Sequence, residues 1–397
     1  MTTAGDRRCV VFSLMANETA LVADGSAPVA TVEADPGQGA SKAPQADERD
    51  SQSSTYDSNL SVKPGGAKSA APLILGAVLV IAISAAIATG AVPVPISAIW
   101  SAERELSELQ RMVLLELRLP RIALAAVVGA ALAASGAVLQ GLFRNPLAEP
   151  QLIGVSSGAA LGAIAMIVLG NDLALPDVIR PYSVSLAAII GALSVTASLY
   201  FIASRRGTGD VTTMLLVGIA INAIATVGIG LFTWLANDGE LRSLTFWSLG
   251  SFGGAQWSTV VPAVILIAAA LLLLAPAGRD LDRLQLGELE ARRLGVSVPS
   301  LKRRLVFASA VGVGAAVAVS GIIAFVGLVV PHIARMLVGV HHRLLIIASS
   351  LLGASLAIIA DLGARTLVAP AEMPVGLITS ALGAPFFLWL ILKVRRR

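Results

Sequence analysis

The feature of this sequence that most constrains its fold is a series of apolar segments, each about as long as a lipid bilayer is thick. From Ala71 onward, these segments alternate with short polar stretches. A helix needs about 20 mainly apolar residues to cross the hydrocarbon core of a bilayer. The sequence therefore predicts an all-α, polytopic membrane protein with about ten transmembrane helices. We place them near residues 72–90, 122–142, 152–170, 182–203, 211–236, 258–276, 305–320, 323–339, 345–367 and 375–393.

The composition agrees with a membrane solvent. Hydrophobic residues make up 56% of the chain and charged residues only 14%, against about 25% charged in a typical soluble domain. The net charge of +4 is an excess of the kind that cytoplasmic loops carry. The basic residues form no patch with interleaved aromatics, so we expect no nucleic-acid partner. A single cysteine, Cys9, excludes an intramolecular disulfide, and we expect no metal site and no catalytic set.

Residues 1–68 differ from the rest of the chain. They are rich in Ser, Ala, Gly, Asp and Pro, a composition typical of disordered segments. The apolar run at residues 9–16 follows Arg7 and Arg8, as in a signal peptide, but it is very short and no convincing small-residue cleavage site follows. A plain polar tail, or a misassigned start codon with Met15 as its rival, explains the run better. Residues 69–397 form the predicted transmembrane domain.

Lysine and arginine orient the predicted helices. The chain ends in Lys393, Val394 and three arginines, and the loops on the same side of the bundle carry most of the other basic residues. The positive-inside rule makes this side cytoplasmic. An even number of spans then places both termini in the cytoplasm, while several acids, such as Glu116 and Glu240, fall on the outer side.

Three arginines break this pattern. Arg118 and Arg121 lie at the outer end of the second segment, and Arg365 lies at the outer end of the ninth. They are either interfacial anchors or a basic ring that awaits an acidic partner. Asp361 lies four residues before Arg365, so an ion pair would lower the cost of both charges in lipid. A lone carboxylate there would instead suit a proton-driven transporter.

Polar residues near the predicted inner face suggest a turn. Gln140 lies near the inner end of the second segment, and Asn145 with Pro146 is a turn signal. A structural turn is the first interpretation of Gln140 and Asn145, and a lining of the translocation path is the second. His332, within the eighth segment, suits structural hydrogen bonding better than contact with a substrate.

The predicted cytoplasmic loop 277–304 is unusually long. Gly287 and Gly295 bracket a short helix in it, and Glu288 and Arg292 have the spacing of a helical ion pair. A loop of this length with its own helix is usually functional. It is either a docking element for a partner on the inside or a helix that lies on the membrane surface. The candidate docking residues are Leu286, Gly287, Glu288, Leu289, Ala291, Arg292, Leu294 and Gly295.

Five sequence blocks together resemble one known family. They are RLPR…GAALA-x-SG…NPLAEP…GVS-x-GA at 118–159, FWSLGSFGGAQW at 246–257, LGELEARRLGV at 286–296, GIIAFVGLVVPHIARM at 321–336 and AEMPVGLITSALGAPFF at 371–387. In this order they resemble the FecCD-type permeases of ABC importers, which take up ferric siderophores, heme and cobalamin. The resemblance extends from about residue 72 to the end of the chain.

The resemblance implies a role for each candidate. Arg118, Arg121 and Arg365 would engage glutamates of a periplasmic binding protein. The loop residues 286–295 would sit in a groove of the ATPase. The permease would work as a homodimer with two ATP-binding subunits, and Asn222 and Gln140 would belong to the translocation path. The chain has no phosphate-binding loop of the GxxxxGK[ST] type, so ATP and magnesium would bind to the partner and this chain would not be an enzyme.

Overall similarity makes heme the expected cargo, with ferric siderophore second and cobalamin third. The expected location is the bacterial inner membrane. Two other classes stay open on the residues alone: an ion-driven secondary transporter, and a passive channel that needs no binding protein.

Overall fold

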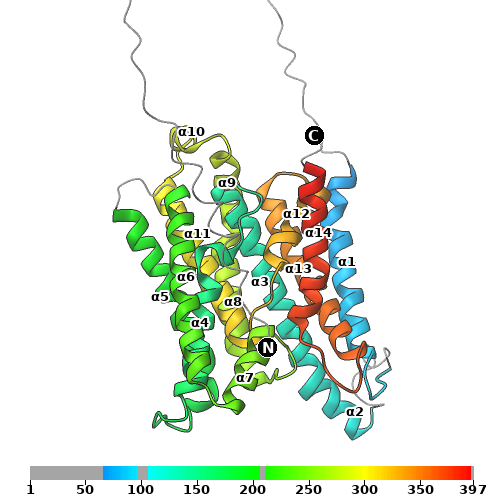
Figure 1. Ribbon diagram of the computed structural model, residues 1–397. Coiled ribbons are helices and arrows are strands. Elements are labelled where there is room, and N and C mark those ends of the chain that lie inside the picture. The colour runs from blue at the N-terminus through cyan, green and yellow to red at the C-terminus, as the bar shows by residue number, and fades with distance from the viewer. Residues whose placement is uncertain (1–65, 96–105, 206–210, 395–397) are drawn as a thin grey trace, which may run out of the picture. The chain divides into compact units, whose positions relative to one another are not determined.

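The computed structural model describes residues 66–95, 106–205 and 211–394, all within the unit Val62–Arg397. These residues form helices joined by short connections, and none of them lies in a strand (Figure 1). Most of the tail predicted for residues 1–68 lies outside the described residues, as do the arginines at 395–397. The first helix, α1, begins at Gly66 and thus includes the last residues assigned to the tail.

Each of the ten predicted segments contains a helix. Seven helical stretches among the described residues are long and apolar enough to cross a membrane, and α4, α12 and α14 are shorter apolar helices. The ten helices are α1 (Gly66–Ala88), α3 (Leu119–Phe143), α4 (Val155–Leu169), α5 (Ser183–Arg205), α6 (Val211–Leu235), α8 (Trp257–Leu274), α11 (Val298–Ser320), α12 (Val326–Val338), α13 (His342–Thr366) and α14 (Val375–Val394).

Two helices at one end of the bundle were not predicted. Helix α2 (Glu108–Met112) begins at a capping box made by Ser107, and a π-helical stretch, η2 (Val113–Arg118), joins it directly to α3. Helix α7 (Asp238–Leu249) begins at Asn237, whose side chain accepts the first free backbone N–H groups. Both lie at the end away from α10 (Figure 1). Each is shorter than a span, so a search for apolar stretches passes over them.

The opposite end carries two short helices, α9 (Gly278–Leu284) and α10 (Glu288–Arg293). The following helix, α11, begins at Val298, before the predicted start near 305. Pro299 lies in its first turn, where a missing N–H costs nothing. Lys302 is 7% exposed and its Nζ lies 2.7 Å from Glu288 Oε1. The basic residues predicted as the end of the loop are therefore the first turns of α11.

Helix α3 is the centre of the bundle and packs against α13, α11, α12 and α8. Small residues make this packing close. A Cβ added to Gly129 would lie 2.2 Å from the carbonyl oxygen of Gly353, and one added to Gly136 would lie 1.9 Å from that of Gly327. Such contacts associate helices in lipid, where apolar burial gives little driving force.

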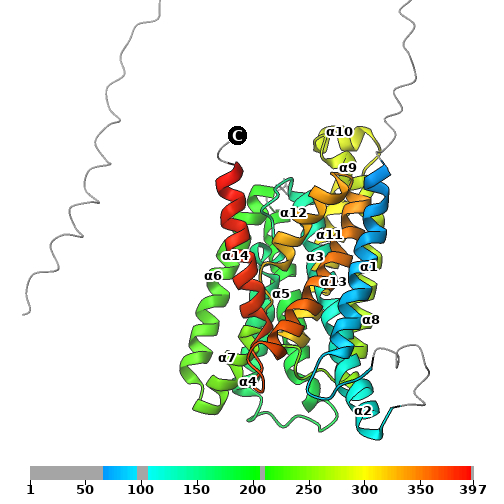
Figure 2. The same cartoon turned by 90° about the vertical axis from the view of Figure 1, so that its right-hand side faces the viewer.

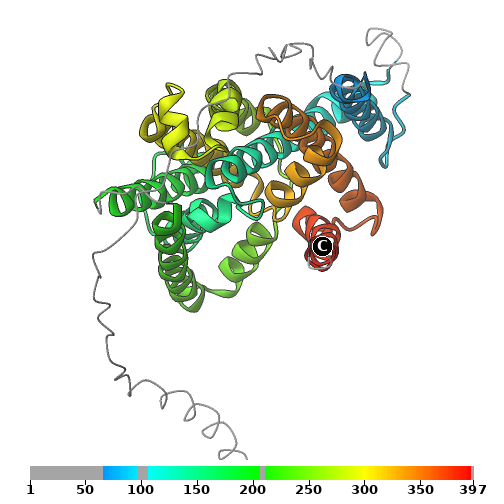
Figure 3. The ribbon, with the colours of Figure 1, turned by 90° about the horizontal axis from the view of Figure 1, so that it is seen from above.

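Helices α6, α7 and α14 lie along one face of the bundle (Figures 2 and 3). This face is loosely covered by the rest of the chain. Only 11% of the membrane-length window of α6 is buried, and the exposed fractions of Ile224 and Trp234 are 70% and 80%. On α14, Leu382 and Leu388 are also exposed. The face is apolar along its length, so it suits lipid or another apolar protein surface.

Candidate functional site

The three arginines singled out in the sequence line one pocket at the α2 end of the bundle. The pocket has a volume of about 730 Å³, and Arg118, Arg121, Arg365 and Glu372 all contribute to its wall. We call it the arginine pocket. Arg118 comes from the end of η2, Arg121 from the first turn of α3 and Arg365 from the last turn of α13. The fold therefore brings together basic residues that are far apart in the sequence.

Two of these arginines bind the end of α1. Arg118 donates to the carbonyl oxygens of Ile87 and Val92, and Arg365 donates to those of Ala86 and Thr89 at 2.9 and 3.3 Å. The last carbonyls of a helix have no intrahelical partner, and a positive charge is favourable at that end of the helix dipole. Arg118 and Arg365 therefore act as a cap that fastens α1 to α3 and α13.

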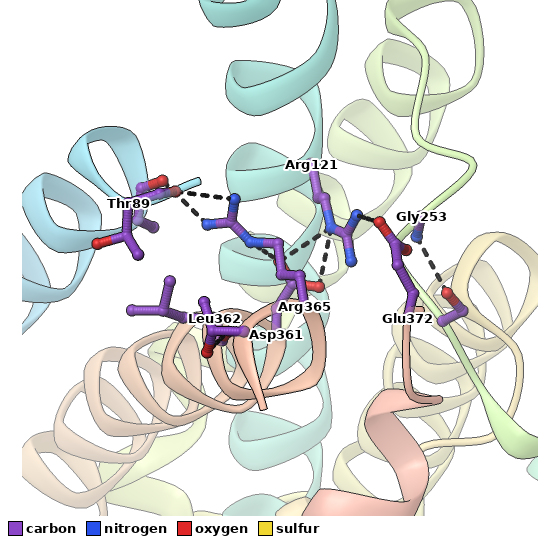
Figure 4. A network of polar contacts seen from close by, with 10 residues as sticks. Thr89, Arg121, Gly253, Asp361, Leu362, Arg365 and Glu372 are labelled. Carbon is purple, nitrogen blue, oxygen red and sulfur yellow. Dashed lines mark hydrogen bonds and ion pairs between the residues drawn. The ribbon is translucent and has the colours of Figure 1, made fainter. Parts of the chain in front are cut away.

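The third arginine holds two carboxylates (Figure 4). Nε of Arg121 lies 3.0 Å from both oxygens of Asp361, and one of its terminal nitrogens lies 2.9 Å from Oε1 of Glu372. Asp361 also lies 3.5 Å from Nε of Arg365. The ion pair predicted between Asp361 and Arg365 is therefore confirmed, with Arg121 as a second and closer partner. Because Asp361 lies between two guanidinium groups, it is not a lone carboxylate of the kind that a proton-driven transporter needs.

This arrangement corrects the picture of an exposed basic ring. Arg118 is 5% exposed, and the side chains of Arg121 and Arg365 are 12% and 13% exposed. A guanidinium group that is buried in a membrane protein requires hydrogen-bond acceptors, and the fold supplies carbonyls and carboxylates. The sequence located the arginines correctly but did not reveal these internal partners. Glu372, whose side chain is 51% exposed, is the most accessible charged group of the network.

At the α10 end, the predicted docking residues divide into an exposed set and an anchoring set. Leu286, Leu289 and Leu294 are 66%, 66% and 50% exposed, whereas Ala291 is fully buried. The short helix between the two glycines is confirmed. Gly287 and Gly295 have φ angles of 108° and 83°, which favour glycine. Helix α10 therefore presents leucines to its surroundings from a fixed position.

The ion pair suggested by the spacing of Glu288 and Arg292 is replaced by another. Glu288 pairs with Lys302 on α11, and Arg292 is exposed. The contact to Lys302 joins α10 to a membrane-length helix, which a pair within the short helix would not do. Arg293 pairs with Glu290 at 2.8 Å on the outer surface of the same helix.

A second link between the α10 end and the bundle was missed in the sequence. Oδ1 of Asp282, on α9, accepts the backbone N–H of His342 at 2.9 Å and lies 2.7 Å from Nδ1 of the same residue. His342 is the first residue of α13. An acid is favourable at a helix N-terminus, so Asp282 caps α13. The only signal in the sequence was an acid in the loop and a histidine that begins an apolar segment.

The two residues assigned to the translocation path are packed against neighbouring helices. Gln140 is 2% exposed, donates to the carbonyl of Leu328 at 3.2 Å and accepts from Arg335 at 3.3 Å. It does not line an open passage between the described residues; it joins α3 to α12. Asn222 is half-buried, donates to the carbonyl of Gln151 at 3.0 Å and accepts from Ser157. It thus joins α6 to the irregular entry of α4.

The turn at Asn145 is confirmed, since its side chain accepts the N–H of Leu147 at 2.9 Å. The nearby Glu149 was not singled out in the sequence. Burial raises the pKa of Glu149 to about 7, although a hydrogen bond from the backbone N–H of Phe325 acts in the opposite direction. This bond joins the turn to the start of α12. The hydrogen-bonding role expected for His332 is not found, because its buried Nδ1 has no hydrogen-bond partner in the described part of the chain.

A helical bundle with membrane-length helices, a charged pocket at one end and an exposed apolar helix at the other defines a membrane protein whose two ends meet partners. It holds the features of a transport subunit. The chain belongs to the FecCD transport family, whose model matches residues 78–393.

Individual relatives agree with this assignment. The chain is 47% identical over 328 residues to the hemin transport system permease protein HmuU of Yersinia pestis, a match that covers 82% of this chain and 97% of the relative. It is 41% identical to the vitamin B12 import system permease protein BtuC of Vibrio parahaemolyticus, over 73% of this chain and 86% of the relative. A solved structure of a metal-chelate type ABC transporter, in an inward-facing conformation, is 32% identical, with a TM-score of 0.72 over 81% of this chain and 98% of that one.

Proposed function

We propose that this chain is the permease subunit of an ABC importer that moves heme across the inner membrane of a bacterium. A periplasmic binding protein would deliver the cargo, and a separate ATP-binding subunit, present in two copies, would supply the energy. In this arrangement the ten apolar helices cross the bilayer, both termini are cytoplasmic, and ATP and magnesium bind only to the partner subunit. Ferric siderophore or cobalamin is the alternative cargo.

The observation that carries the proposal is that α13 joins two separate contact sites. Its last turn holds Asp361 and Arg365 in the arginine pocket, and its first residue is bound by Asp282 of α9. A single rigid helix thus connects the α2 end to the helices that carry the exposed leucines. An importer that is driven by an ATPase needs such a connection, because events at the binding protein and at the ATPase must be coupled.

The arginine pocket supports docking of an acidic partner at the α2 end. Arg118, Arg121 and Arg365 place three guanidinium groups beside two carboxylates, which leaves positive charge for an incoming glutamate. At the other end, an exposed leucine triplet on a fixed helix suits a groove in an ATPase subunit. The apolar face of α6, α7 and α14 suits the second copy of a homodimer, and the translocation path would then run between the copies.

Heme is favoured as cargo by the comparisons of sequence. Identity to the hemin permease is 47% over 97% of its length, against 41–43% over 84–86% of the length of the vitamin B12 permeases. The path contains no assigned cargo ligand, so this preference rests on similarity over the whole chain.

The test is reconstitution of the chain with its ATP-binding partner in proteoliposomes. We expect ATP hydrolysis to be stimulated by the cognate binding protein loaded with heme, and less by the same assay with ferric siderophore or cobalamin. Uptake of heme should require ATP and be blocked by vanadate. Uptake that follows a proton gradient without ATP would show a secondary transporter, and flux without a binding protein would show a channel.

A further inference from the structure

Glu372 differs from the other charged groups of the arginine pocket in its position. It lies in the short connection between α13 and α14, and its side chain is half exposed. Its Oε1 accepts from Arg121 at 2.9 Å, while its Oε2 lies where a Cβ added to Gly253 would be only 2.8 Å away (Figure 4). Glu372 therefore reaches Arg121 across the mouth of the pocket, over a loop that has room for it because residue 253 is glycine.

The two carboxylates bound by Arg121 are not equivalent. The side chain of Asp361 is 3% exposed and has two arginine partners, so its removal would leave buried charge without a partner. Glu372 is exposed to solvent and has one arginine partner among the printed contacts of the described residues. An ion pair with an exposed carboxylate contributes about 0–1 kcal/mol. Asp361 is thus a permanent counter-ion of Arg121, whereas Glu372 is readily replaced.

We propose that Glu372 occupies the place at Arg121 that a carboxylate of the docking partner takes, so that docking displaces Glu372 from the arginine pocket. This inference rests on the proposed function, since it names the group within the permease with which the acidic side chain of the binding protein competes. In the free permease, Glu372 neutralises Arg121. In the docked complex, the partner's carboxylate does so.

Displacement of Glu372 has a direct route to α14. Glu372 is followed by Met373, whose N–H binds the carbonyl of Ala364 at 3.0 Å, and by Val375, whose N–H binds the carbonyl of Gly250 at 3.0 Å. Val375 is fully buried and is the first residue of α14. A shift of residue 372 therefore acts on the loop after α7 and on the start of α14, both on the apolar face proposed for the second copy and the path.

Two substitutions test the competition with a matched control. Glu372→Gln removes the charge and keeps the shape, and Gly253→Ala pushes the carboxylate away from Arg121 by its added Cβ. Gly254→Ala changes the next residue of the same loop, where an added Cβ meets nothing within 4 Å. We expect the cognate binding protein to bind the reconstituted permease–ATPase complex about 3- to 5-fold more tightly in the first two variants. We expect no change in Gly254→Ala.

A second readout needs no partner. With the single cysteine removed by Cys9→Ser, a nitroxide attached through Val368→Cys reports on the connection between α13 and α14. We expect its mobility to rise in Glu372→Gln and Gly253→Ala, to stay unchanged in Gly254→Ala, and to rise in the otherwise unaltered chain when the binding protein is added.

Failure of the inference is distinguishable from failure of the docking role. Arg121→Gln weakens binding if the arginine pocket docks the partner at all. Weaker binding in Arg121→Gln with an unchanged Kd in Glu372→Gln overturns the competition and leaves docking intact. An unchanged Kd in both variants overturns the docking role as well. Tighter binding in Glu372→Gln without any change in nitroxide mobility overturns the displacement of the connection.

Discussion

Arg118 and Arg365, from two different helices, bind neighbouring carbonyl groups at one end of a third: Arg118 donates to Ile87 and Arg365 to Ala86, both in the last turn of α1. The two residues therefore fix the position of α1 before any partner arrives. Charge reversal at either residue would place a carboxylate against carbonyl oxygens and damage the fold. For this reason Arg121, whose contacts are with carboxylates, is the better residue for a test of docking.

Gly90 makes the cap of α1 possible. A Cβ at residue 90 would lie 2.3 Å from a terminal nitrogen of Arg118, so Gly90→Ala should displace the guanidinium group. We expect a loss of about 1–3 kcal/mol, measured as a lower thermal unfolding midpoint of the purified protein. Gly76→Ala, in the same helix with nothing within 4 Å of the added Cβ, serves as the control. Equal midpoints for Gly90→Ala and the unaltered protein would exclude a structural role for this approach.

Asp282 should be needed for coupling, because it joins α9 to the first residue of α13. Asp282→Asn keeps an acceptor for the backbone N–H of His342 but loses the negative charge at the helix N-terminus. We expect stimulation of ATP hydrolysis by the binding protein to fall on the order of 5-fold, with basal hydrolysis retained. Asp280→Asn, on the same helix and in longer ion pairs with Arg283 and Arg304, is the control. A similar loss in both variants would argue that only the general charge of α9 matters.

Leu289 should be needed for recruitment of the ATPase. It is 66% exposed on α10, so Leu289→Asp leaves the core intact and places a charge at the proposed contact. We expect affinity for the ATP-binding subunit to fall about 10-fold or more, measured by co-purification at graded concentrations. Arg293→Ala, on the same short helix, should have a small effect, since its ion pair with Glu290 is exposed. Normal recruitment in Leu289→Asp would remove α10 from the ATPase contact.

Glu149 should make stability depend on pH. Burial raises its pKa to about 7 in the folded chain, whereas an unfolded glutamate titrates near 4.5. Between these values the folded state binds more protons, so the free energy of unfolding falls as pH rises through that window. Glu149→Gln should remove this part of the pH dependence and raise stability at pH 8 by at most about 3 kcal/mol. The check is the thermal midpoint at pH 5 and pH 8, and parallel shifts in both proteins would contradict it.

The helices were largely predictable because crossing a bilayer imposes length and apolarity on each of them. All ten predicted segments contain helices, and the short helix between Gly287 and Gly295 was also found. Helices α2 and α7 were not predicted, since they are too short or too polar to stand out as spans. The start of α11 was misplaced because Lys302 reads as a loop residue until Glu288 is seen beside it.

The sequence by itself determined that this chain is an all-α membrane protein of a transport family, and it marked Arg118, Arg121 and Arg365 as unusual. Hydrophobic length and charge asymmetry are local properties, so they can be read along the chain. Only the tertiary structure decided what these arginines bind. Their partners are the carbonyls that end α1 and the carboxylates of Asp361 and Glu372. Apart from Asp361 and Arg365, one helical turn apart, these groups meet only when α1, α3, α13 and the start of α14 pack at one end of the bundle, which no local pattern encodes.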